Sequence, residues 1–115
     1  MLSEDNHKND MVFNALADPI RRQLLDQIAL TGEATATTLA KKVPVSRQAV
    51  VKHLTVLNDA GLVFSTRIGR EMRHRVCPGQ LFSTAEWMRN IATEWDRKLD
   101  WIKDKAEMKD NKNDH

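Results

Sequence analysis

The sequence has few of the residues that make covalent cross-links or metal sites. Its 115 residues include one cysteine, Cys77, which excludes a disulfide within the chain and a Cys-x-x-Cys metal motif. No segment approaches the roughly 18 apolar residues of a membrane span, and the polar N-terminal segment is unlike a signal peptide. We therefore expect one cytoplasmic domain that needs no cofactor and no membrane.

The chain is also poor in glycine and in net charge. Its four glycines form no phosphate-binding loop, and no set of Ser, His and acid occurs in a suitable local context, so an enzyme is not expected. The formal net charge is +2, which is too small by itself to indicate a nucleic-acid partner. A DNA-binding site would have to come from local clusters of Lys and Arg.

Hydrophobic periodicity predicts a mainly α-helical domain with one β-hairpin. Asp18 and Pro19 form a helix start, because an aspartate N-cap accepts a bond from a free backbone N–H and a first-turn proline loses no donor. Thr35 and Ser46 are further N-cap candidates. Polar, frayed ends are expected over 1–10 and 109–115, with a folded domain over 11–108. The expected elements are helices over 11–17, 19–31, 36–43, 47–60 and about 81–108, and strands over 62–68 and 72–77 around a turn at 69–71.

The third and fourth of these helices have the spacing of a helix-turn-helix. Leu39 and Ala40 are expected to pack on Val50 and Leu54, so that the opposite face of the fourth helix projects outward. A hairpin that follows such a recognition helix is called a wing. The predicted fold class is therefore a winged helix-turn-helix with five helices and two strands.

The outward face of the fourth helix carries residue types that read DNA. Gln can bond to adenine, Arg to guanine and Lys to phosphate, and Val can touch a thymine methyl group. On this face stand Arg47, Gln48, Val51, Lys52 and His53. The hairpin adds a local excess of cations over one acid, Glu71. These cations are Arg67, Arg70, Arg73, His74 and Arg75. Strand alternation puts Arg73 and Arg75 on one face, so only some of them can point at DNA. A merely solvated basic surface is the alternative.

Four motifs, taken in order, are similar to those of a known family. They are Ala17-Asp18-Pro19-Ile20-Arg21-Arg22, Pro44-Val45-Ser46-Arg47-Gln48-Ala49-Val50-Val51-Lys52-His53-Leu54, Leu57 with Ala60-Gly61-Leu62-Val63, and Arg67-Ile68-Gly69-Arg70-Glu71. Together they resemble the successive signatures of the ArsR, or arsenic-repressor, family over roughly 11–78. The resemblance implies a winged-helix dimer that binds inverted-repeat operators in double-stranded DNA and usually represses transcription. Carried over position by position, it implies DNA contacts at Ser46, Arg47, Gln48, Val51, Lys52 and His53 in the recognition helix and at Arg67, Arg70 and Arg73 in or near the wing.

Departures from the family pattern limit what it implies. Metal-sensing members carry a Cys-x-Cys pair before the recognition helix, or Asp and His pairs on the last helix. This chain has neither, so no metal site is expected. Val51 stands where Ser is common in relatives, and base preference at that position does not transfer.

His74 stands where relatives often have an aromatic residue. We interpret it as a half-exposed strand histidine, with a weak pH dependence as the alternative. Cys77 is interpreted as structural and partly buried rather than as a redox sensor.

The last helix holds most of the aromatic mass of a chain without tyrosine. A domain this small cannot cover so wide an apolar arc, so part of the helix is expected to meet a partner. We predict that this helix and the first one pair with their twofold mates in a homodimer, setting two recognition helices ~34 Å apart. The expected interface residues are Trp87, Ile91, Trp95, Leu99 and Ile102. A small-molecule pocket lined by the tryptophans is the alternative, and the sequence leaves open whether any effector exists.

A winged helix used for protein interaction is the main competing function. Such a module would present an apolar or acidic surface where this chain has Arg47, Gln48 and Lys52. The sequence therefore favours DNA binding, although neither the operator nor the regulated genes can be read from it.

Overall fold

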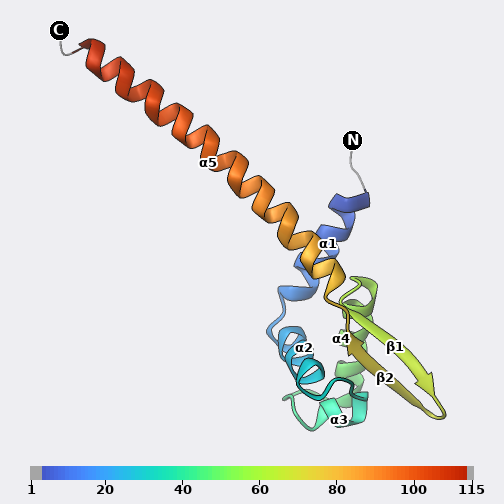
Figure 1. The fold of residues 1–115 in the computed structure, drawn as a ribbon. Coiled ribbons are helices and arrows are strands. Elements are labelled where there is room, and N and C mark those ends of the chain that lie inside the picture. Colours follow the sequence, from blue (N-terminus) through green and yellow to red (C-terminus); the bar gives the residue numbers. More distant parts are fainter. Residues whose placement is uncertain (1–3, 114–115) are drawn as a thin grey trace. The chain divides into compact units, whose positions relative to one another are not determined.

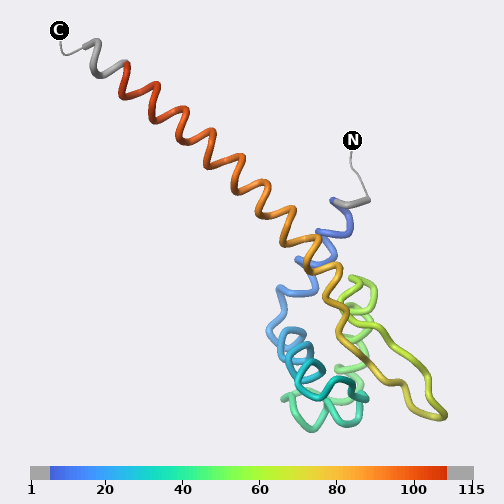
Figure 2. Tube along the Cα trace, in the orientation of Figure 1, coloured from blue at the N-terminus to red at the C-terminus, as the bar shows by residue number. Residues whose placement is uncertain are grey.

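The computed structural model describes the backbone of residues 4–113 and the side chains of residues 6–108. The chain divides into two compact units, one up to Thr84 and one from Ala85 on. Figures 1 and 2 trace the elements in chain order. These are α1 (Glu4–Leu16), α2 (Pro19–Thr31), α3 (Ala36–Ala40), α4 (Arg47–Asp59), β1 (Val63–Ile68), β2 (Glu71–Val76) and α5 (Gly79–Asn113).

Three helices begin at side-chain caps, as the sequence predicts. The Asp18 carboxylate accepts bonds from two backbone N–H groups at the start of α2, with Pro19 in the first turn. Thr35 caps α3 by accepting from the N–H of Thr38, and Ser46 caps α4 by accepting from the N–H of Ala49. Because each cap satisfies an orphan donor locally, these starts can be read from a few residues of sequence.

Three helices differ by more than one residue from the sequence-based expectation. α1 starts at Glu4, inside the segment expected to fray, because the side chain of Asn9 is buried and bonded to Thr84. α3 ends at Ala40 rather than Val43, whose side chain is buried in the core from the turn that follows the helix. α5 begins at Gly79 and continues to Asn113, past the expected end at 108. The parts of the expected tails at 1–3 and 114–115 lie outside the described residues.

The core of the first unit is centred on α4. One face of this helix buries Val50, Leu54 and Leu57, which join Leu24 of α2 and Leu39 of α3 in a single apolar cluster. The helix-turn-helix packing expected from the sequence is confirmed, with Ala40 partly buried against the same cluster. Burying an aliphatic side chain of this size contributes about 1.5–3 kcal/mol, so the core fixes the rotation of α4 about its axis.

The hairpin is fastened to the core at its base and free at its tip. β1 and β2 are antiparallel, in register from Val63 opposite Val76 to Ile68 opposite Glu71, and they lie side by side in Figures 1 and 2. A two-residue loop joins them, with Gly69 at φ +64°, the pattern of a type II′ turn.

The edge of β2 also pairs with the connection between α2 and α3. The backbone N–H groups of Ala34 and His74 each donate to the other residue's carbonyl, at 3.0 and 2.9 Å. This isolated bridge joins the wing to the helical core.

Removing the Thr84 hydroxyl is expected to destabilise the fold. Thr84 Oγ1 donates to Asn9 Oδ1 at 2.7 Å, and both side chains are buried. Thr84→Val leaves that acceptor unsatisfied, so the free energy of unfolding should fall by about 1–3 kcal/mol in urea denaturation. Thr55→Val is the matched control, because the exposed Thr55 hydroxyl bonds only to a carbonyl of its own helix. Equal losses in the two variants would contradict the role of the buried bond.

Candidate DNA-binding surface

The face of α4 that points away from the core is polar and accessible. Arg47, Gln48, Val51 and Lys52 are all exposed, whereas the intervening Val50 is buried. Thr55 extends the same face one turn further, and its hydroxyl donates to the Val51 carbonyl at 3.1 Å. Sequence reasoning identified the first four residues and missed Thr55, although the three- and four-residue spacing from Val51 and Lys52 was available to find it.

Ser46 and His53, two other expected contact residues, have structural partners. Ser46 is exposed, and its hydroxyl caps α4 by accepting from the Ala49 N–H at 3.1 Å. His53 is half-buried at the border of the face, where Arg21 Nη1 of α2 lies 3.3 Å from its Nδ1. Their positions favour roles in holding α4 over direct contact with a ligand.

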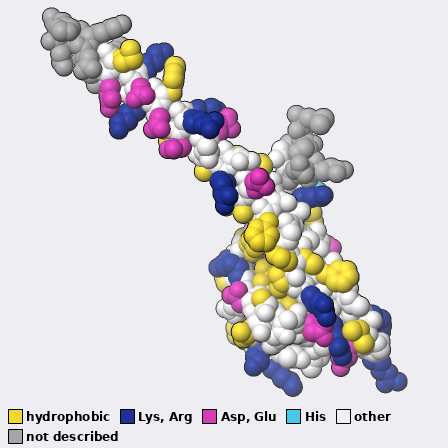
Figure 3. Space-filling view, viewed as in Figure 1, with side chains coloured by type: hydrophobic (Ala, Val, Ile, Leu, Met, Phe, Trp, Pro, Cys, Tyr) yellow, Lys and Arg dark blue, Asp and Glu magenta, His cyan; other side chains and the backbone are white. Residues whose placement is uncertain are grey.

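Two arginines at the end of the hairpin are free of acidic partners. Arg67 and Arg70 are exposed, and neither forms an ion pair with any side chain that the structure describes. Figure 3 shows Lys and Arg side chains gathered at this end of the hairpin. Their positive charge is therefore available to an external anion.

Arg73 and Arg75, by contrast, are held by a single carboxylate. Arg73 Nη1 lies 3.0 Å from Glu33 Oε1, and Arg75 Nη2 lies 3.0 Å from Glu33 Oε2. Hydrogen bonds from Arg75 and Arg73 lower the pKa of Glu33. Arg73 Nε also lies 3.4 Å from Glu71 Oε2. The two arginines do share one strand face, as expected, but Arg73, an expected DNA contact, lies in an ion-pair cluster.

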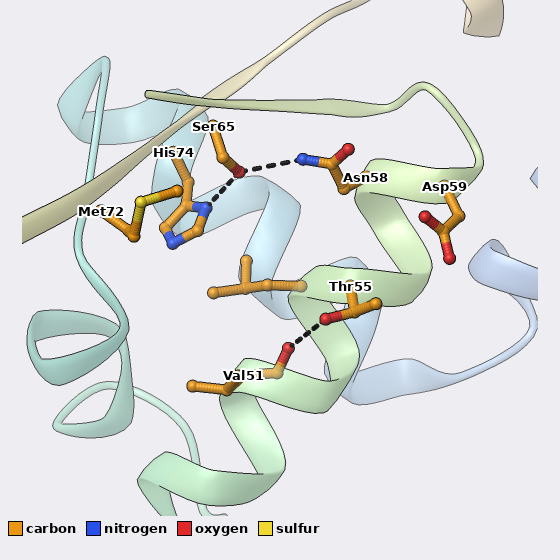
Figure 4. Close-up of a pocket in the computed structure, with 8 residues that line it drawn as sticks. Val51, Thr55, Asn58, Asp59, Ser65, Met72 and His74 are labelled. Carbon is orange, nitrogen blue, oxygen red and sulfur yellow. Dashed lines mark hydrogen bonds between the residues drawn. The ribbon is translucent and has the colours of Figure 1, made fainter. Parts of the chain in front are cut away.

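A groove of about 360 Å³ separates α4 from the wing (Figure 4). A chain of hydrogen bonds crosses its floor: Asn58 Nδ2 donates to Ser65 Oγ at 3.0 Å, and 2.7 Å separates Ser65 Oγ from His74 Nδ1. His74 is only 7% exposed, so the interpretation as a half-exposed strand histidine is wrong. Its side chain points to the face that packs on α4, and this burial lowers the pKa of His74.

Comparison with known proteins agrees with this architecture. A family model described as a helix-turn-helix domain matches residues 16–64. An ArsR-like transcriptional regulator from Rhodococcus sp. RHA1 has a solved structure that is 40% identical, covers 88% of this chain and 94% of its own, and superposes with a TM-score of 0.80. The chain belongs to the ArsR family of transcriptional regulators.

Two further relatives are relevant to function. The transcriptional repressor SdpR of Bacillus subtilis is 30% identical over 88 residues, which is 76% of this chain and 97% of that protein. A winged helix-turn-helix domain from Mycobacterium bovis, described as homodimeric and DNA-binding, is 26% identical with a TM-score of 0.60 and covers 76% of this chain and 81% of its own.

Within the described part of this ArsR-family chain, no group of three or more His, Cys, Asp or Glu side chains is placed to hold a metal ion. No helix in that part is long and apolar enough to cross a membrane. Cys77 is half-buried at the end of the hairpin, as interpreted from the sequence.

Acid should destabilise the domain through His74. Burial lowers the pKa of His74 in the folded state, so His74 of the unfolded chain binds a proton first as the pH falls. The free energy of unfolding is therefore highest above pH ~6.5 and decreases as the pH falls toward the pKa of His74 in the folded state. One proton gives a slope of at most about 1.4 kcal/mol per pH unit. Urea unfolding between pH 5 and pH 8 should show this slope in the wild type and in His7→Gln, whose histidine is exposed, and a flatter profile in His74→Gln. An unchanged profile in His74→Gln would assign the acid sensitivity elsewhere.

Proposed function

We propose that the protein is a transcriptional repressor that acts in the cytoplasm and binds an inverted-repeat operator as a homodimer. One observation carries the proposal: α4 has an accessible, mostly polar face, and Arg70 of the hairpin turn, which has no acidic partner among the described residues, lies beside its Arg47. A helix of this width fits the major groove, and a flanking hairpin reaches the neighbouring backbone. Repression is inferred from the similarity to SdpR.

Within α4 the residues divide by chemistry. Gln48 and Val51 stand at the centre of the exposed face and can contact base edges, through a bidentate amide to adenine and a methyl contact to thymine. Lys52 supplies a charge for a phosphate. Arg67 and Arg70 are the wing contacts that the proposal retains, whereas the two glutamates that hold Arg73 argue against a contact there.

The second unit supplies the surface for dimerisation. Its helical segment carries an apolar stripe on one side, in which Trp95 is 62%, Leu99 64% and Ile102 55% exposed. Ile91 continues the stripe at helical spacing, and Trp87 borders it. Lys98, paired with Glu94 at 3.2 Å, borders the stripe beside Trp95 and Leu99. Large apolar side chains this accessible are typical of an interface, and the homodimeric neighbour from Mycobacterium bovis supports the same assignment.

Selection of bound duplexes from a random pool, at physiological salt and with the mass of the complex measured, tests the function directly. The proposal expects an enriched inverted repeat with half-sites about one helical turn apart, bound by two chains. Weak binding that is lost with salt and enriches no sequence would overturn it and would favour a winged helix used for protein interaction.

Lys52→Ala should weaken DNA binding by a similar factor on every sequence. Losing one phosphate contact lowers the slope of log affinity against log salt concentration by about 0.9. The measurement is a fluorescence-anisotropy titration of the selected operator and of a scrambled duplex at several salt concentrations. Lys103→Ala removes an exposed lysine from the second unit and is the matched control. A slope that does not change in Lys52→Ala would remove this residue from the backbone contacts.

Trp95→Glu should produce a folded monomer that binds the operator poorly. Trp95 is 62% exposed in the single chain, so its replacement leaves the folded unit intact but places a charge in the interface. Trp101→Glu is a close control, because Trp101 is 63% exposed but lies about 120° around the helix, where Lys105 covers its ring. Sedimentation of Trp95→Glu as a dimer would exclude Trp95 from the interface.

A further inference from the structure

We propose that Thr37, Arg47 and Arg70 form a binding seat for one backbone phosphate of DNA, with Thr37 as the residue that positions Arg47. The inference rests on the proposed function and adds Thr37, which the sequence did not indicate, to two arginines that were expected to contact DNA. It concerns the point where α3, the start of α4 and the hairpin tip come together.

A polar hollow of about 300 Å³ lies at this junction. Hydroxyl groups line it from α3, one arginine lines it from α4 and another from the turn of the hairpin. Its lining residues are Thr35, Ala36, Thr37, Thr38, Arg47, Arg70, Glu71 and Met72. The hollow therefore joins three elements that are separated in sequence and brings their donors to one place.

One edge of the Arg47 guanidinium group is hydrogen-bonded within the protein, and the other edge is available to a ligand. Its Nε donates to Thr37 Oγ1 at 3.1 Å, which leaves the N–H groups of both terminal nitrogens without a hydrogen-bond partner among the described residues. That fork matches two oxygens of a phosphate. Thr37 accepts the bond from Arg47, so its own hydroxyl proton remains free for a second acceptor.

Apart from the three residues of the seat, the polar side chains that line the hollow are engaged in contacts within the protein. Thr35 and Thr38 bond to each other at 2.9 Å and cap α3, so the inference does not rely on them. Glu71 would repel an anion, but Arg73 Nε lies 3.4 Å from its carboxylate and offsets its charge. Arg70 has no acidic partner among the described residues, and it supplies the second positive charge.

Two kinds of substitution separate charge from positioning. Thr37→Val keeps both arginines, so the salt slope should stay as in the wild type while operator affinity falls by roughly three- to tenfold, the effect of one lost hydrogen bond. Arg47→Lys keeps the charge but loses the fork, and it should also lower affinity at an unchanged slope. Thr31→Val is the matched control, because that hydroxyl bonds to carbonyls at the end of α2.

The decisive test changes the DNA as well as the protein. Single phosphates of the selected operator are replaced by neutral methylphosphonates, and affinity is measured by fluorescence anisotropy for the wild type and each variant. One phosphate position should weaken the wild type and Thr31→Val equally, but weaken Thr37→Val and Arg47→Lys much less. Thermal melting should show that Thr37→Val folds as the wild type does, since Thr37 is exposed.

The outcomes distinguish this inference from the function beneath it. If the wild type binds the operator and every methylphosphonate affects Thr37→Val as it affects the wild type, the phosphate seat is overturned and the repressor function stands. If the wild type enriches no operator at all, the proposed function falls and the seat falls with it.

Discussion

Burial of one face of α4 is the constraint on which the rest of the structure depends. Val50, Leu54 and Leu57 occupy the centre of the core, so the helix cannot turn without exposing them. The direction of the polar face is therefore fixed by the packing of the opposite face of α4 in the core, and not by any contact on the polar face itself. The residues of a surface fixed in this way can be exchanged without loss of the fold.

The wing is positioned from the same core by backbone and charge. The bridge between Ala34 and His74 fixes the edge of β2, and the bond from Asn58 to Ser65 joins α4 to β1. Glu33 adds two ion pairs beside the bridge. These contacts reach to the middle of the hairpin and stop short of its turn, so the tip projects beyond them and Arg67 and Arg70 stay exposed.

The features that sequence could predict are those encoded locally. The caps at Asp18, Thr35 and Ser46, the turn at Gly69 and the exposed face of α4 each depend on a few neighbouring residues. The family motifs added the order of the elements. The sequence could not show that glutamates hold Arg73 and Arg75, because strand alternation does not tell which side chains of other elements face the strand.

The missed features depend on contacts between distant parts of the chain. The start of α1 depends on the bond between Asn9 and Thr84, 75 residues apart. The burial of His74 follows from the packing of its strand face on α4, and the orientation of Arg47 depends on Thr37 across the helix-turn-helix connection. No periodic pattern records such pairs.

The Glu33 cluster has a consequence for how the protein moves among DNA sites. In the proposed DNA complex, a carboxylate that neutralises cations of the wing lowers the affinity shared by all DNA sequences, since that affinity is supplied by charge alone. With Arg73 and Arg75 engaged, the hairpin retains its tip arginines as its unpaired ones. The time spent on each wrong site shortens accordingly, and a larger share of the protein is left to search for the right one.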